Sequence, residues 1–238
     1  MKIDSNVLID VFKELDTTST RETTIIPKDG CWDLYSMDPS KTAVVAATIK
    51  APTFTEGNNL EKDITVPVPF MLDVLQKDKI CDLTVDNGSN LIIKYDKSKR
   101  TKRLYEPEDG PRPIPSLEGM STCIIMSDDL INVAKQPCFT NITTDSGGIT
   151  LRMTETGVIF EVISETESAE MTADGTGVLE DDVVQARFSI KILLPMLKVL
   201  PKGVAVSVLM KSDHPIHLSI DEDKYSMDIY AAPMIVEE

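Results

Sequence analysis

The sequence predicts an α+β fold made of two similar domains, each with antiparallel sheets and two short helices. Three observations predict this fold: a pattern that recurs once with an offset of 122 residues, alternating segments that outnumber the helical ones, and a proline-rich connector between the halves. The 238 residues allow two domains of roughly 100 residues each. We expect these domains at residues 1–106 and 121–238, with the connector at residues 107–120.

The repeat is clearest in the helical segments. Residues 8–13 (LIDVFK) recur as residues 130–135 (LINVAK), with four of six positions identical. At the same offset, the apolar pattern of residues 66–75 lies opposite that of residues 188–197. Amphipathic patterns converge easily, so one match alone could be accidental. The shared order and spacing of the matches indicate two similar half-chains.

Most other segments alternate apolar and polar side chains, as half-buried strands do. Each half is expected to contain a helix, several strands, a second helix and further strands. Because strands outnumber helices, the pattern favours antiparallel sheets. The strand candidates are residues 30–35, 42–49, 64–68, 80–85, 91–96, 148–153, 158–163, 185–190, 204–210 and 225–231.

The composition indicates a globular protein that does not coat DNA. With 42% hydrophobic and 26% charged residues, the chain can bury a sizeable core. Its 39 acidic residues outnumber 24 Lys and Arg residues, which gives a net charge of −15. Affinity for nucleic acid comes largely from cations that displace counterions, so the composition alone argues against a DNA-coating protein.

The chain is expected to be soluble and intracellular. No stretch reaches the ~18 apolar residues of a membrane helix, and residues 1–10 lack the apolar core of a secretory signal. The four cysteines form no CxxC pair, so we expect reduced thiols rather than a zinc site.

The sequence contains no motif that supports an enzyme. It lacks a phosphate-binding loop, a dinucleotide fingerprint, a nucleophile elbow and a zinc-protease pair. His214 and His217 are three residues apart in a predicted strand, so they point to opposite faces, which argues against a shared metal site. We therefore expect no catalytic residue, metal or cofactor. A hydrolase whose acids converge only in the fold is an open alternative.

The connector is rich in residues that favour extended, exposed chain. Residues 106–119 contain four prolines and two glycines. The simplest interpretation is a plain linker. The alternative is that Ile114 and Leu117, two apolar residues in a polar segment, lie at a partner site.

Two stretches of opposite charge stand out. Five cations crowd into residues 97–103, which should form a strand ending near Tyr105, whereas residues 161–174, at the corresponding stage of the second half, contain five acids and no cation. Charge can simply protect a free sheet edge from aggregation. Alternatively, the basic edge of one subunit pairs with the acidic edge of the next. The residues of that contact would be Lys97, Lys99, Arg100, Lys102, Arg103, Glu165, Glu167 and Glu170.

Seven lysines accompany the four expected helices. Lys13 and Lys135 occupy equivalent positions of the repeat. Exposed lysines are common on helices, but helices that face one side of a ring would combine them into a belt of positive potential. The lysines are Lys13, Lys77, Lys79, Lys135, Lys191, Lys198 and Lys202.

Four segments together resemble the proliferating-cell-nuclear-antigen (PCNA) type of DNA sliding clamp, particularly its archaeal members. Residues 34–40 (LYSMDPS) are similar to the family's L-x-S-M-D-x-S segment, and residues 229–238 (IYAAPMIVEE) to its Y-x-A-P-x-I tail with an acidic end. The other two are Ile114 with Pro115 in the connector, and residues 213–216 (DHPI). Their order and spacing extend the resemblance over nearly the whole chain.

The resemblance implies a non-enzymatic processivity factor. It implies a closed homotrimeric ring of six domains, with sheets outside and helices inside around duplex DNA, which the seven lysines would face. It also implies that the ring tethers DNA polymerase, a clamp loader, flap endonuclease and DNA ligase through short peptides for replication and repair. The compartment would be the cytoplasm, at the nucleoid of an archaeon, or the nucleus of a eukaryote.

By position, the resemblance also assigns an apolar pocket for the partner peptide. The pocket residues are Met37, Val44, Ile114, Pro115, Pro215, Tyr230, Ala231, Ala232 and Pro233.

Acids among the expected helices predict an inner surface less basic than the family usually has. These acids are Asp10, Glu14, Asp73, Asp78, Asp128 and Asp129. An alternative function is a clamp-like module that recruits partners within a hetero-oligomeric ring.

Overall fold

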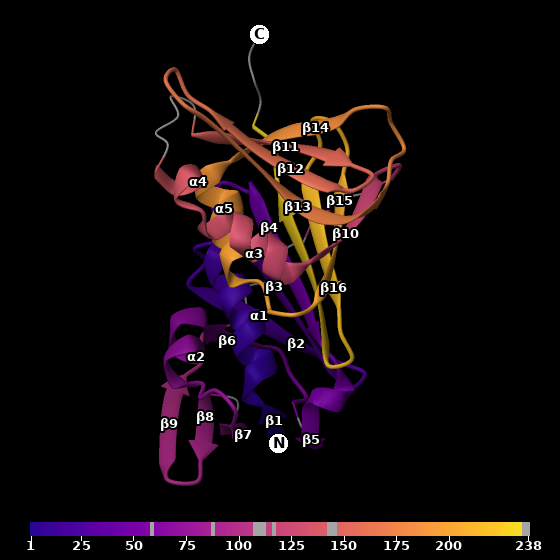
Figure 1. The fold of residues 1–238 in the computed structure, drawn as a ribbon. Coiled ribbons are helices and arrows are strands. Elements are labelled where there is room, and N and C mark those ends of the chain that lie inside the picture. The colour runs from indigo at the N-terminus through magenta and orange to yellow at the C-terminus, as the bar shows by residue number, and fades with distance from the viewer. Residues whose placement is uncertain (58–59, 87–88, 107–112, 116–117, 142–146, 235–238) are drawn as a thin grey trace. The chain divides into compact units, whose positions relative to one another are not determined.

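The computed structural model describes residues 1–57, 60–86, 89–106, 113–115, 118–141 and 147–234. The chain forms two compact units (Figure 1). Of the boundaries between the two units, the one between Pro113 and Ile114 lies inside the expected connector. The first unit comprises Met1–Pro39, Val44–Pro113 and Asp221–Met227, and the second comprises Ser40–Ala43, Ile114–Ile220 and Asp228–Glu238.

The first unit contains two helices beside two sets of antiparallel strands. One set has the order β5-β1-β7-β8-β9, and the other has the order β6-β2-β3-β4. Helices α1 and α2 pack together, and α1 buries an apolar stripe that includes Leu8, Phe12 and Leu15. The elements are β1 (Lys2–Asp4), α1 (Ser5–Thr17), β2 (Glu22–Lys28), β3 (Cys31–Met37), β4 (Ala43–Ile49), η1 (Ala51–Thr53), β5 (Phe54–Glu56), β6 (Ile64–Pro67), α2 (Val68–Val74), β7 (Ile80–Asp86), β8 (Asn90–Tyr95) and β9 (Ser98–Arg103).

A short segment late in the chain completes the first unit. The ammonium group of Lys224 lies 2.7 Å from the Asp4 carboxylate, and the backbone N–H of Lys50 donates to the Lys224 carbonyl at 2.8 Å. These bonds explain why Asp221–Met227 belongs to this unit.

The second unit contains one antiparallel sheet with the strand order β14-β11-β12-β13-β10-β15-β16. Helices α3 and α5 pack against each other, and α3 also contacts β10 and β13. Strand β17 begins in residues of the first unit and ends in residues of the second. The elements are β10 (Ser121–Met126), α3 (Ser127–Lys135), α4 (Pro137–Asn141), β11 (Gly148–Thr154), β12 (Gly157–Ile163), β13 (Ser168–Val178), β14 (Val184–Ser189), α5 (Ile190–Val199), β15 (Ala205–Met210), β16 (Ile216–Asp221) and β17 (Tyr225–Ala231).

The repeat is visible in equivalent hydrogen bonds. The backbone N–H of Ser5, the first residue of α1, donates to the Lys79 carbonyl at 3.0 Å. The N–H of Ser127, which begins α3 and lies 122 residues later, donates to the Val204 carbonyl at 2.9 Å. Both acceptors directly precede a strand, β7 or β15. Each unit therefore ties the start of its first helix to the same turn.

The predicted α+β class with two similar halves is confirmed. All ten strand candidates are present, with ends shifted by at most two residues, and the basic run forms β9. Four expected helices are α1, α2, α3 and α5, and the short α4 is an addition in the second half. Strand β13 escaped prediction because almost every side chain on it is polar or small, so it has no apolar alternation.

Two details of the sequence interpretation are wrong. The acidic residues 161–174 do not correspond to the basic strand, because β9 follows β8 as β17 follows β16, whereas β13 follows β12 as β4 follows β3. His214 lies in the turn before β16, not in the strand with His217. A similar distance along each half-chain did not identify equivalent strands, and the alternation that begins at Ile216 did not extend back to His214.

One buried acid in α1 sets a pH dependence. Glu14 is fully buried, and neither carboxylate oxygen has a hydrogen-bond partner among the described residues. Burial raises the pKa of Glu14 well above its usual value, and the nearby Asp10 raises it further. The neutral acid is therefore the form that the fold accommodates. Its contribution to stability is fully present below the pKa of the unfolded chain and is lost as pH rises through the higher folded pKa.

We expect Glu14→Gln to stabilise the protein at pH 8 and to have a smaller effect at pH 5. Glutamine cannot ionise, so the substitution removes a cost of about 1–3 kcal/mol for a buried, unpaired charge. Urea unfolding at both pH values measures the difference. The matched control is Glu61→Gln, which changes an exposed acid. Equal effects of Glu14→Gln at both pH values would contradict the assignment.

Candidate nucleic-acid interface and protein contact surfaces

Three of the expected lysines lie together in the first unit. Lys13 is exposed on α1, and Lys77 and Lys79 are exposed in the turn between α2 and β7. The Ser5 bond to the Lys79 carbonyl attaches this turn to the start of α1. Burial raises the pKa of Asp10, and the positive charges of Lys13 and Lys77 oppose that shift, so both lysines act on the same carboxylate.

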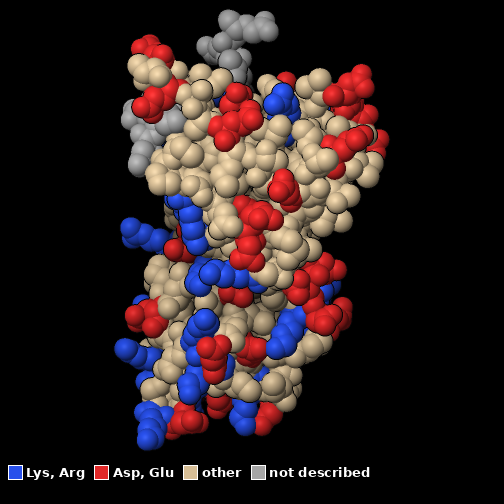
Figure 2. Space-filling model, viewed as in Figure 1, with Lys and Arg blue, Asp and Glu red and all other residues tan. Residues whose placement is uncertain are grey.

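The other four lysines lie on the helices and a turn of the second unit. Lys135 ends α3, Lys191 and Lys198 lie on α5, and Lys202 follows in the turn before β15. Lys191 is exposed in the first turn of α5, where the helix dipole disfavours a cation. A contribution to helix stability therefore does not explain why a lysine occupies position 191. On the face that carries the helices, Figure 2 shows cations interspersed with acids.

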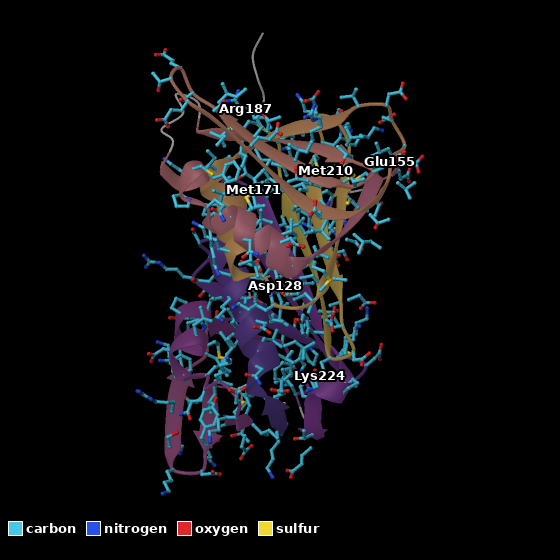
Figure 3. The ribbon with its side chains drawn as sticks, in the orientation of Figure 1. Asp128, Glu155, Met171, Arg187, Met210 and Lys224 are labelled. Atoms are coloured by element: carbon cyan, nitrogen blue, oxygen red, sulfur yellow. The ribbon has the colours of Figure 1, made fainter. Side chains whose placement is uncertain are left out.

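Several acids near these lysines have internal partners or are partly buried. The Asp128 carboxylate, at the start of α3 (Figure 3), accepts the Gly203 N–H at 2.9 Å. The N–H of Asp78 donates to the Asn6 side chain at 3.0 Å, and the Asp78 carboxylate accepts from it at 3.3 Å. Asp10 is half-buried, and burial raises its pKa. These hydrogen bonds give Asp78 and Asp128 structural roles within their own units, and burial removes Glu14 from the surface.

The basic strand β9 has one edge without a partner strand in the described chain. It pairs with β8 alone, from Asn90 opposite Arg103 to Tyr95 opposite Ser98. Lys99, Arg100, Lys102 and Arg103 lie on the strand, and Lys97 lies in the preceding turn. The Lys102 ammonium group lies 5.9 Å from the centre of the Phe70 ring, so this cation also contacts its own unit.

Strand β13 changes partner along its length. Its first part, residues 168–174, pairs with β12, and residues 175–178 pair with β10. The other edge of residues 168–174 therefore has no strand beside it within the described chain. Glu170 lies on this part, 4.0 Å from Arg152, whereas Glu165 and Glu167 lie in the turn before the strand. The structure thus places one predicted acid on the edge and two beside it.

In the first unit, the connector contacts the segment that resembles the clamp family. The Tyr35 hydroxyl donates to the Pro113 carbonyl at 3.1 Å and lies 3.5 Å from the sulfur of Met37. Met37 is half-buried and Val44 is buried. A pocket of about 530 Å³, which sequence reasoning missed, adjoins Met37 and is lined by Ser19, Thr20, Arg21, Glu22, Met37, Pro39 and Tyr105.

In the second unit, the predicted pocket residues differ in exposure. Ile114 is 54% exposed, whereas Tyr230 is 6% and Ala231 2% exposed. Pro115, Pro215, Ala232 and Pro233 are half-buried. The Ala232 N–H donates to the Thr42 carbonyl at 2.7 Å, which fixes the start of the tail. Leu117 and residues 235–238 lie outside the described residues.

Sequence reasoning missed a cluster around Tyr230. The imidazole of His217 stacks on the Tyr230 ring, with centres 4.4 Å apart and planes 6° apart. Nε2 of His217 lies 2.8 Å from a carboxylate oxygen of Asp228. Asp228 and Tyr230 are two residues apart on β17, so strand alternation could have placed them on one face. The pairing with β16 could not be read from either strand alone.

Within the described residues, no three side chains of His, Cys, Asp or Glu are placed to share a metal ion. The four cysteines are free thiols. No described helix has the length and apolar character needed to cross a membrane.

Comparison with known proteins relates the fold to the sliding clamps. No family model and no curated protein matches the sequence. Among solved structures, the chain is similar to A. fulgidus PCNA bound to the C-terminal region of FEN-1 (TM-score 0.84, 18% identity, covering 100% of this chain and 99% of that one). It is also similar to PCNA from Entamoeba histolytica (0.84, 20%, 98% of each chain) and from Thermococcus kodakaraensis (0.85, 15%, 98% and 99%). The chain therefore has the PCNA-type clamp fold, as the resemblance implies.

We expect Asp128→Ala to destabilise the protein by about 1 kcal/mol, because it removes a charged acceptor of a backbone N–H and an acid from the first turn of α3. Asp129→Ala is the matched control, since it removes an acid from the same turn without a hydrogen bond to Gly203. Urea unfolding at neutral pH compares the two variants. Equal losses of stability would show that the bond to Gly203 contributes nothing.

Proposed function

We propose that this chain is a DNA sliding clamp: three copies close a ring around duplex DNA and tether replication and repair enzymes without catalysing a reaction. The observation that carries the proposal is the PCNA-type clamp fold over the full length of the chain. In this proposal, residues 1–106 and 121–238 are the two clamp domains, and residues 107–120 are the connector. Three chains supply the six similar domains of a ring.

The seven lysines are proposed to face the DNA. Encirclement holds DNA by topology, so the contacts can be weak. Weak, sequence-independent contacts to phosphates also allow sliding. Hydrogen bonds within their own units account for Asp128 and Asp78, so the presence of these acids near the lysines does not contradict this role.

The unpaired edges of β9 and β13 are proposed to meet across each subunit boundary. Each edge exposes backbone groups along six or seven residues, and their charges are opposite. Since every chain carries one edge of each kind, the contact is head-to-tail and can close a ring. The basic side comprises Lys97, Lys99, Arg100, Lys102 and Arg103, and the acidic side comprises Glu165, Glu167 and Glu170.

Partners are proposed to bind through short peptides with apolar anchors. The structure of A. fulgidus PCNA with the C-terminal region of FEN-1 supports this mode. The proposed contacts are Met37 and Val44 in the first unit, and Ile114, Pro115, Pro215 and Tyr230–Pro233 in the second. The proposed partners are DNA polymerase, a clamp loader, flap endonuclease and DNA ligase.

We expect light scattering to give three times the 26.3 kDa mass of one chain. The variant Lys99→Glu/Arg103→Glu should lose the trimer, because like charges then meet at the boundary, and so should Glu167→Lys/Glu170→Lys. The chain with all four substitutions should regain the trimer, since its edges are again complementary. A trimer that is unaffected by either reversal would exclude this contact. Assembly only with a different protein would favour the hetero-oligomeric alternative.

Retention on DNA tests the function itself. Dissociated subunits are reassembled in the presence of circular duplex DNA and then exposed to about 0.5 M salt, which screens phosphate contacts. We expect the protein to stay on the circle and to leave once a restriction enzyme linearises it. Loss from the circle at high salt would exclude topological binding.

A further inference from the structure

His217, Asp228 and Tyr230 form one cluster on neighbouring strands of the second unit, which we call the His217 cluster. The two rings are stacked in parallel, and the imidazole is fixed at its edge by the Asp228 carboxylate. The side chain of Asp228 is 41% exposed and that of His217 is 12% exposed. The cluster thus connects a buried aromatic ring to the solvent side of β17.

The contacts restrict how the Tyr230 ring can turn. Nε2 of His217 faces the carboxylate, so it carries a proton and donates to Asp228. This bond is the main reason that the pKa of Asp228 is lowered, and Ser219 contributes as well. Burial, with a smaller effect of Asp228, raises the pKa of Tyr230 to about 12, so its ring stays neutral. The imidazole is thus held in one orientation by Asp228, and its plane packs against one face of the Tyr230 ring.

The His217 cluster contains a feature that lowers the stability of the folded chain. Nδ1 of His217 is buried and has no hydrogen-bond partner among the described residues. An unpaired polar atom costs free energy on burial, which an apolar residue at the same position would avoid. Its chain neighbours Ile216 and Leu218 are buried on the opposite face of β16, whereas His217 shares the half-buried face with Ser219. The polar pair therefore needs a reason other than packing.

We propose that His217 and Asp228 are positioning residues for partner binding, which hold the Tyr230 ring in the orientation that receives an apolar anchor of the partner peptide. This inference rests on the proposed peptide-binding function. A ring that is already fixed loses little conformational entropy when the peptide binds, so its orientation contributes to affinity. His217 acts through Tyr230 and need not touch the peptide.

The probe is a synthetic peptide of the C-terminal region of FEN-1, the ligand of the similar A. fulgidus PCNA. By titration calorimetry, we expect His217→Ala to weaken binding about 3- to 10-fold. His217→Phe should restore most of the affinity, because it keeps an aromatic ring stacked on Tyr230. His214→Ala is the matched control: it removes an exposed histidine of the turn before β16 and should leave affinity unchanged.

A double-mutant cycle separates positioning from a general structural effect. In a Tyr230→Leu background, His217→Ala should change the affinity no further, because the ring through which it acts is absent. If His217→Ala fails to fold, Asp228→Ala serves instead, since it removes the hydrogen bond at a partly exposed site. Additive effects in the cycle, or unchanged affinity in His217→Ala, would overturn the inference while the proposed function stands. A wild-type chain that does not bind the peptide would overturn both.

Discussion

In each unit, one backbone hydrogen bond ties a lysine-bearing turn to the start of the first helix. Ser5 in the first unit and Ser127 in the second each donate from the start of a helix to the residue before a strand. The bond brings the turn that carries Lys77 and Lys79, or the one that carries Lys202, to the helix start. Packing of α1 on α2 and of α3 on α5 completes each helical surface. Without these ties, the cations would be scattered along 190 residues of chain.

The acidic composition and the proposed DNA function are compatible because the positions of the charged side chains matter more for DNA binding than the net charge does. A net charge of −15 argues against a protein that coats DNA, since coating depends on many phosphate contacts. A ring needs few such contacts. Asp128 and Asp78 bind backbone or side-chain groups of their own unit, and Glu14 is buried. Asp128 and Asp78 therefore serve the fold of their own unit, and burial removes Glu14 from the surface.

One physical rule applies to both the strand edges and the His217 cluster. A polar group without a hydrogen-bond partner either binds a partner from another molecule or lowers the stability of the fold. Backbone groups along β9 and the first part of β13 have no partner strand within the described chain, and the opposite charges beside them suit each other. The unpartnered Nδ1 of His217 carries a free-energy cost of burial. In one case the missing partner is proposed to be another copy, and in the other the cost is proposed to serve recognition.

The sequence by itself determined the elements and their duplication. Alternation placed ten strands to within two residues, because a strand with one buried face must repeat every second residue. The matching helices followed from the spacing of apolar residues in LIDVFK and LINVAK. The tail and the LYSMDPS segment also indicated the clamp fold.

Only the tertiary structure decided which strands pair and what each polar group meets. Strand β13, almost without apolar side chains, could be found only through its pairing with β12 and β10. The burial of Glu14 and the stack of His217 on Tyr230 likewise depend on how separate elements pack against each other. Local patterns encode which face of an element is buried. They do not encode the neighbour that buries it, because register and strand order are set by the packing of the whole unit.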